Sequence, residues 1–200
     1  MRSAALQADS GVRRFFNPHD QCWHVQVTQG ETYVTDNAQE ILTTILGSCI
    51  AACIRDPLAR VGGMNHFLLP NGKSGDAGAA RFGVNAMEIL INDILKRGGA
   101  RGRLEAKLFG GASVVAGLSN VGSGNIAFAE KFLADEGIPQ VGGDVRGTMA
   151  RRIQYWPVTG RARQLAVSSG NEAALVEDEL AFAAQTMTSK SGAGSDVELF

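Results

Sequence analysis

The sequence predicts a single layered domain of the α/β (α+β) class, in which helices pack on mixed or antiparallel sheets. Many short segments alternate apolar and polar residues, which is typical of half-buried strands. Two longer segments repeat apolar residues at helical spacing and are long enough to cover a sheet. Glycine is abundant, with 25 residues against 5 prolines, so many tight turns are expected. Together these features favour a layered α/β sandwich.

The predicted strands follow from the alternation and from the turn residues that separate them. In the first strand, Trp23, Val25 and Val27 lie on one side. Gln29-Gly30 then indicates a hairpin turn into the second strand. The predicted strands cover residues 22–28, 31–35, 41–46, 50–55, 61–69, 104–109, 140–145, 152–158 and 161–167.

Helical spacing occurs in two places. Residues 84–95 are predicted to form one helix, which Lys96-Arg97-Gly98 closes with cations and a glycine. Residues 125–136 are predicted to form the other, with Asn125 as its N-cap.

The two ends of the chain differ in composition from its centre. Residues 1–20 show no clean periodicity and are expected to form a flexible N-terminal arm. The folded domain is expected over residues 21–170. Residues 171–200 are expected to be a C-terminal extension, disordered from about residue 187 because that part is rich in Ser and Gly.

The composition argues against several classes of function. A formal net charge of −1 provides no basic surface for nucleic acid or for a membrane. No signal-peptide pattern and no membrane-spanning apolar run occur. The 3 cysteines, an odd number without framework spacing, indicate a reducing compartment and hence the cytoplasm. Because no metal-ligand spacing or phosphate-binding loop is found, we expect no cofactor and no metal.

The segment Gly47-Ser48-Cys49 stands between two apolar runs and predicts a sharp turn. A cysteine at such a turn can act as a nucleophile, because neighbouring backbone N–H groups can converge on an oxyanion. The backbone N–H groups of Ser48 and Cys49 are the candidate donors. The alternative interpretation is a structural cysteine, since free cysteines are commonly buried.

His66 lies in an apolar strand that follows the cysteine. If residues 50–55 and 61–66 form a hairpin centred on the Pro57-Leu58 bond, His66 lies directly opposite Cys49 on one face of the sheet. A loop that is asymmetric by one residue would send the two side chains to opposite faces.

A thiol and an imidazole in contact form a recognised catalytic pair. The imidazole takes the thiol proton, and it later protonates the leaving amine. A third group usually orients the imidazole, and the hydroxyl of Thr43 or of Thr44 can accept a hydrogen bond from the ring. The spacing does not choose between these two threonines.

Residues 46–57 (Leu-Gly-Ser-Cys-Ile-Ala-Ala-Cys-Ile-Arg-Asp-Pro) and 62–70 (Gly-Gly-Met-Asn-His-Phe-Leu-Leu-Pro) resemble the chemoreceptor glutamine deamidases of the CheD family. Three further blocks agree, namely residues 105–112, Gly122 with Asn125, and residues 142–161. The resemblance covers roughly residues 21–168.

The resemblance implies a fold similar to the catalytic domains of deamidating bacterial toxins. It implies hydrolysis of particular glutamine side chains on methyl-accepting chemotaxis receptors, without a cofactor. Cys49 matches the family's nucleophile, His66 its base, and Thr43 the threonine that orients the histidine. Many members also bind a CheC-type phosphatase. Where the family often has Arg before the residue matching Asn125, this chain has Gly124.

Two other classes of function fit the same residues. One is a different cysteine amidohydrolase that uses the same pair, and the other is a non-catalytic chemotaxis regulatory module that binds receptors or a regulator. The presence of Cys49, His66 and Thr43 together favours an enzyme. Cys53 is expected to be structural, because it lies further along an apolar strand.

Overall fold

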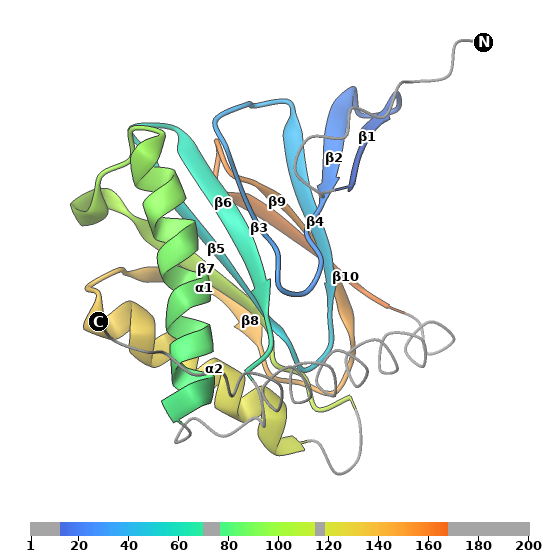
Figure 1. Cartoon of the computed structure of the whole chain (residues 1–200). Helices are drawn as coiled ribbons and strands as arrows, with labels where there is room; N and C mark the ends of the chain where they lie inside the picture. The colour runs from blue at the N-terminus through green and yellow to red at the C-terminus, as the bar shows by residue number, and fades with distance from the viewer. Residues whose placement is uncertain (1–12, 70–76, 115–118, 168–200) are drawn as a thin grey trace, which may run out of the picture.

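The computed structural model describes residues 13–69, 77–114 and 119–167 of the chain (Figure 1). Its elements in chain order are β1 (Arg13–Asn17), β2 (Cys22–Gln26), β3 (Thr32–Thr35), β4 (Glu40–Leu46), β5 (Ile50–Asp56), β6 (Val61–Phe67), α1 (Ala77–Lys96), the 3-10 helix η2 (Arg101–Arg103), β7 (Glu105–Gly110), α2 (Ser119–Asp135), β8 (Gln140–Val145), β9 (Arg151–Trp156) and β10 (Arg161–Ala166).

The strands form two sheets that pack face to face. The outer sheet has the order β1-β2-β4-β9-β10, and the central sheet has the order β3-β6-β5-β7-β8. Each sheet is mixed, since β2 pairs with β4 and β7 pairs with β8 in parallel while the other neighbours are antiparallel. The predicted α+β sandwich class is therefore confirmed.

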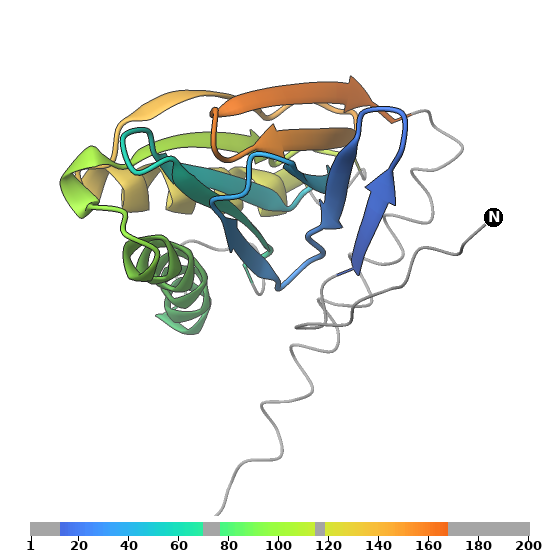
Figure 2. The same ribbon diagram turned by 90° about the horizontal axis from the view of Figure 1, so that it is seen from above.

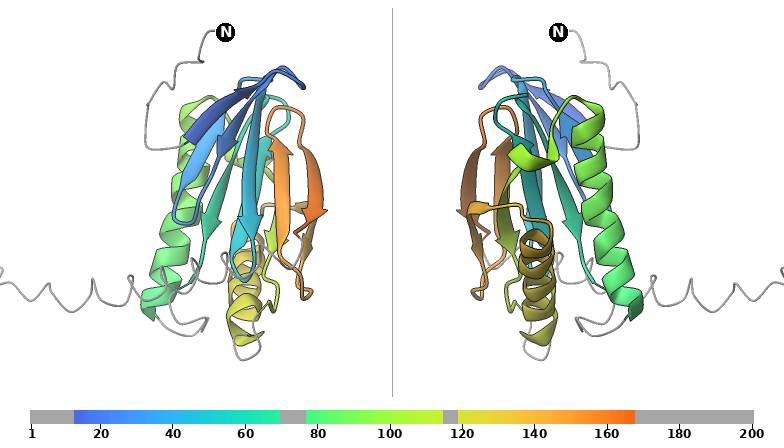
Figure 3. Two further views of the ribbon diagram at one scale, coloured as in Figure 1. Left: turned by 90° about the vertical axis from the view of Figure 1, so that its right-hand side faces the viewer. Right: turned by 90° about the vertical axis from the view of Figure 1, so that its left-hand side faces the viewer.

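Both helices pack on the central sheet, on the face opposite the outer sheet. α1 contacts β3, β5 and β6, whereas α2 contacts β5, β7 and β8. Seen from above, α1 and the β9–β10 pair lie on opposite sides of the β5–β6 pair (Figure 2). The side views show the same order of layers (Figure 3). In the part of the chain that the structure describes, no helix has the length and apolar character needed to cross a membrane.

Each interface between layers holds its own apolar core. The core under the helices includes Ile54, Leu90, Ile91, Leu108 and Phe132. The core between the sheets includes Val25, Leu42, Leu46, Ile153 and Tyr155. β5 contributes alternate residues to both cores, which explains why nearly its whole length is apolar.

The predicted hairpin between residues 22–28 and 31–35 is wrong. β2 pairs with β1 and β4 in the outer sheet, whereas β3 pairs with β6 in the central sheet. The Gln29-Gly30 turn therefore passes from one sheet to the other. Alternation locates a strand and its buried side, but it does not identify the strand beside it.

The expected flexible arm over residues 1–20 contains a strand. β1 pairs with β2 along its whole length. Arg14 on β1 forms an ion pair of 2.6 Å with the buried Glu40, and its guanidinium lies 4.4 Å from the centre of the Trp23 ring. These contacts attach the strand to the outer sheet. The proposed tail over residues 171–200 lies outside the described residues.

Asp56 anchors the loop of the β5–β6 hairpin, and its side chain is fully buried. Its Oδ1 accepts hydrogen bonds from the N–H groups of Leu58 and Ala59 at 2.9 and 3.0 Å. Its Oδ2 accepts from the Ala100 N–H and from Arg103 Nε, both at 2.9 Å. Burial by itself would raise the pKa of Asp56, but the hydrogen bonds from Arg103 and the backbone hold that pKa well below its usual range.

We expect Asp56→Asn to lower the free energy of unfolding by about 3 kcal/mol near pH 7, because buried donors lose a charged acceptor. The folded-state pKa is lowered, so the stabilisation is complete above the unfolded-state pKa of about 3.9 and decreases as the pH falls below it. Urea denaturation at about pH 7 and about pH 3 measures this, and the loss should be smaller at the lower pH.

Asp93→Asn is the matched control for this prediction. Asp93 pairs with Lys96 on the exposed surface of α1 and should contribute within about 0.5 kcal/mol. If Asp56→Asn is as stable as Asp93→Asn, Asp56 does not stabilise the hairpin loop as described.

Candidate active site

The turn Gly47-Ser48-Cys49 carries the chain from β4 in the outer sheet to β5 in the central sheet. Hydrogen bonds from other elements hold the carbonyl oxygens of all three residues. Gly47 O accepts from the Ala112 N–H at 2.8 Å, and Cys49 O accepts from the Gly111 N–H at 2.8 Å. Ser48 O accepts from Asn125 Nδ2 at 2.9 Å. The backbone that carries the Cys49 thiol is therefore fixed from two sides.

Asn125 lies inside α2, six residues after the helix begins at Ser119, so its predicted role as N-cap is wrong. Its side chain is fully buried and makes a second hydrogen bond, accepting from the Leu69 N–H at 2.9 Å. One amide thus links α2 to the cysteine turn and to the segment after β6. The glycine-rich start of α2 hides the helical spacing there, which explains why the sequence prediction began too late.

Gly110 allows the backbone after β7 to approach the cysteine turn. Its φ is +105°, and a Cβ placed on it would lie 2.1 Å from Cys49 O. No residue with a side chain fits this position without moving the turn. The approach lets Gly111 reach the carbonyl of Cys49 with its N–H.

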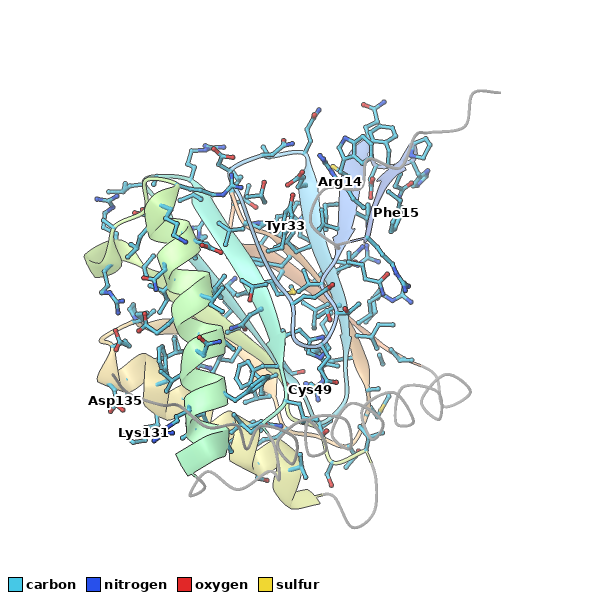
Figure 4. The ribbon with its side chains drawn as sticks, viewed as in Figure 1. Arg14, Phe15, Tyr33, Cys49, Lys131 and Asp135 are labelled. Carbon is cyan, nitrogen blue, oxygen red and sulfur yellow. The ribbon has the colours of Figure 1, made fainter. Side chains whose placement is uncertain are left out.

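His66 lies on β6, and the structure corrects its predicted register. Ala51, and not Cys49, is its direct partner on β5. The hairpin loop is centred one residue later than predicted, and this moves every pairing by two residues. Since a shift of two preserves the face, Cys49 and His66 remain on the same side of the sheet as diagonal neighbours. In Figure 4, Cys49 lies near the end of β6, far from Tyr33 and Arg14.

The Nδ1 of His66 lies 2.9 Å from the Oγ1 of Thr44, which projects inward from β4 in the facing sheet. Both side chains are buried. Thr43, which the resemblance selected, lies on the other face of β4, and its hydroxyl is 3.5 Å from Val25 O. The threonine in contact with His66 is therefore Thr44, and not Thr43 as the resemblance implied. Alternation along β4 requires this, because Leu42 and Leu46 face the core between the sheets.

Gln29 is a site residue that the sequence analysis missed. Its Oε1 accepts a hydrogen bond of 3.4 Å from the Sγ of Cys49. Gln29 lies in the loop between β2 and β3, 20 residues before the cysteine. No sequence pattern joins the two residues, because the contact depends on β2 and β3 belonging to different sheets.

Cys53 lies in the core between the sheets, to which Cys49 also contributes. Burial raises the pKa of the Cys53 thiol far above its ordinary value, which disfavours the reactive thiolate. Among residues 13–69, 77–114 and 119–167, no group of three or more His, Cys, Asp or Glu side chains has the arrangement of a metal site.

The fold and the site define a class of protein: an α+β two-sheet domain with a cysteine on a braced turn and a histidine oriented by a threonine of the facing sheet. The sequence model of the family "CheD chemotactic sensory transduction" matches residues 68–165. Curated relatives match over longer stretches. The chain belongs to the CheD family.

These relatives carry the name "Probable chemoreceptor glutamine deamidase CheD". The protein of Caulobacter vibrioides (strain NA1000 / CB15N) is 59% identical over 149 residues, covering 74% of this chain and 80% of the relative. That of Caulobacter sp. (strain K31) is 52% identical, covering 88% and 92%. That of Acidiphilium cryptum (strain JF-5) is 53% identical, covering 78% and 84%.

Solved structures show only a distant likeness. The Neisseria meningitidis protein NMB0706 aligns with a TM-score of 0.40 and 16% identity over 60% of this chain and 54% of that one. This likeness is too low to contribute to the interpretation of the site.

We expect Asn125→Leu to destabilise the protein by about 2–4 kcal/mol, because it leaves the buried Ser48 carbonyl and Leu69 N–H without their partner. Chemical denaturation measures the change. Asn92→Leu is the matched control, since Asn92 is exposed on α1 and its amide lies 3.5 Å from a carboxylate oxygen of Glu88. Equal stability of the two variants would contradict the role of Asn125.

Proposed function

We propose that this protein hydrolyses the side-chain carboxamide of particular glutamines on chemotaxis receptors, giving glutamate and ammonia. The observation that carries the proposal is the Cys49–His66–Thr44 arrangement on a braced turn, in a chain whose curated relatives are named as glutamine deamidases. A thiol and an oriented imidazole provide the chemistry that amide hydrolysis requires.

In the proposed mechanism, the Thr44 hydroxyl accepts a hydrogen bond from the Nδ1–H of His66 and so fixes the ring and its tautomer. Nε2 then takes the thiol proton of Cys49. The thiolate attacks the carboxamide carbon of the glutamine, and the carbonyl oxygen becomes an oxyanion. The backbone N–H groups of Ser48 and Cys49 are the candidate donors to that oxyanion, because the turn that carries them is held rigidly by its carbonyls.

The second half of the reaction regenerates the thiol. The imidazolium of His66 gives its proton to the nitrogen of the tetrahedral intermediate, and the C–N bond breaks with release of ammonia. Water, deprotonated by His66, attacks the thioester, and the C–S bond breaks. The products are a glutamate side chain and the Cys49 thiol. No step uses a metal or an organic cofactor.

The proposal includes a cellular setting and partners. Catalysis by a thiol requires a reduced cysteine, which favours the cytoplasm. The protein substrate is the cytoplasmic part of a methyl-accepting chemotaxis receptor, and a CheC-type phosphatase is the proposed regulatory partner. We expect part of the substrate contact in residues 71–80 and 110–124, of which 71–76 and 115–118 lie outside the described residues.

We expect Cys49→Ala and His66→Ala to abolish deamidation while the fold is retained. Peptide mass spectrometry of receptor cytoplasmic fragments should show a gain of about one mass unit at specific glutamines with the unmutated protein only. Cys53→Ala is the matched control, since Cys53 is about equally buried but lies four residues further along the chain, paired with Met64 rather than beside His66, and it should keep its activity.

Deamidation by a folded Cys49→Ala variant would contradict the mechanism. If the folded, unmutated protein changes no receptor fragment, the non-catalytic binding module or a different amide substrate becomes the better explanation. Cleavage of the fragment backbone would instead indicate a cysteine peptidase.

The two threonines of β4 provide a separate prediction. Thr44→Val keeps the volume of the side chain but removes the hydrogen bond to His66, so we expect kcat to fall by about one to two orders of magnitude. Thr43→Val should leave kcat within about twofold, because the hydroxyl of Thr43 lies on the other face of the strand. Steady-state kinetics measure kcat for both variants. A larger loss of kcat in Thr43→Val than in Thr44→Val would contradict the positioning of His66 by Thr44.

A further inference from the structure

The carboxamide of Gln29 lies in the candidate active site and contacts the sulfur of Cys49. The Sγ of Cys49 donates a hydrogen bond of 3.4 Å to the Oε1 of Gln29. This is the same chemical group that the proposed reaction hydrolyses. A glutamine side chain of the protein therefore lies beside the candidate nucleophile, where the glutamine of a substrate would have to bind.

The loop that carries Gln29 is attached to the strand of the candidate base. The Gly30 N–H donates to His66 O at 2.7 Å, and the His66 N–H donates to Glu31 O at 3.0 Å. Within the loop, the Thr28 N–H donates to a carboxylate oxygen of Glu31 at 2.7 Å. Gly30, with a φ of +85°, supplies the turn. The backbone on either side of Gln29 is thus fixed relative to both Cys49 and His66.

The site is closed with Gln29 in this position. The side chain of Cys49 is fully buried, and that of His66 is 6% exposed. Because Gln29 contacts the sulfur at 3.4 Å, a carboxamide from another protein that binds at the same place has to displace its side chain.

The side chain of Gln29 is half-buried, and one of its two polar atoms has no hydrogen bond within the described part of the chain. Its Nε2 is buried and has no hydrogen-bond partner among the residues that the structure describes. An unpaired buried N–H group costs free energy, and turning the side chain towards water would remove that cost. Displacement of the side chain loses the hydrogen bond from the thiol, and hydration of Nε2 offsets part of that loss.

We propose that Gln29 occupies the carboxamide subsite of the enzyme and competes with the substrate for it. The inference rests on the proposed function for the identity of the substrate group. In the resting protein, the hydrogen bond to Oε1 stabilises the protonated thiol, since a bond to the neutral form disfavours the charged form. A receptor glutamine that replaces the side chain of Gln29 brings its own carboxamide carbon to the sulfur, where the thiol can attack it once His66 has taken the proton.

The first test needs no receptor. Iodoacetamide, a small carboxamide reagent, is reacted with the full-length protein, and alkylation of Cys49 is followed on its own peptide by mass spectrometry. Gln29→Ala should raise the rate constant about five- to tenfold, as expected if Gln29 fills the subsite in about 80–90% of the molecules. Gln26→Ala is the matched control, because Gln26 lies on β2, beside Thr43 and away from the sulfur.

An unchanged rate in Gln29→Ala would overturn the proposal. A slower rate would also overturn it, because Gln29 would then be a residue that assists the thiolate. If Gln29→Ala does not fold, Gln29→Glu retains the shape of the side chain. It should slow the alkylation, since a carboxylate beside the sulfur disfavours the thiolate. An unchanged rate in Gln29→Glu would be evidence against occupation of the site.

The second test uses receptor fragments. Gln29→Ala should lower KM severalfold and leave kcat within about twofold, because removal of a competitor strengthens binding without changing the chemical step. A large loss of kcat would overturn the inference. Gln29→Ala could be alkylated faster while neither it nor the unmutated protein deamidates any fragment. This result would support Gln29 as the occupant of the site and would contradict the proposed function.

Discussion

The passage of the chain from the outer sheet to the central sheet at Gly47–Cys49 fixes the position of the candidate nucleophile. Hydrogen bonds hold all three carbonyl oxygens of this passage, two from the segment after β7 and one from Asn125 of α2. Three layers of the fold therefore meet at one turn. Because each bond is buried, losing one leaves a desolvated polar group, and the turn resists local opening.

The orientation of the histidine depends on the packing of the two sheets. His66 belongs to the central sheet, and Thr44 belongs to the outer sheet, so their contact of 2.9 Å bridges the two. Leu42 and Leu46, on either side of Thr44, pack in the core between the sheets and hold β4 in register. Close packing in such a core allows β4 to move little relative to the central sheet. The apolar contacts therefore fix the position of Thr44 relative to His66.

The parts that could be predicted from sequence are those that local pattern determines. Alternation located most strands, and the Cys49–His66 pair was placed on the right face, although its register was wrong by two residues. The partner of β3 and the start of α2 were wrong, because neighbouring strands and glycine-rich helix starts depend on tertiary contacts. Residue spacing alone does not choose between Thr43 and Thr44, since the core between the sheets decides which face of β4 points inward.

The way the Gln29 loop is attached limits how the site can open. Its backbone is bonded to both the N–H and the carbonyl of His66, through Glu31 and Gly30. A movement of the whole loop would break those bonds and disturb the imidazole that catalysis needs. Rotation of the Gln29 side chain about its own bonds leaves the backbone in place and costs only a weak hydrogen bond to sulfur. Opening by rotation of this side chain therefore preserves the position of His66. The space that the Gln29 carboxamide leaves beside the sulfur is then filled by the carboxamide of the substrate.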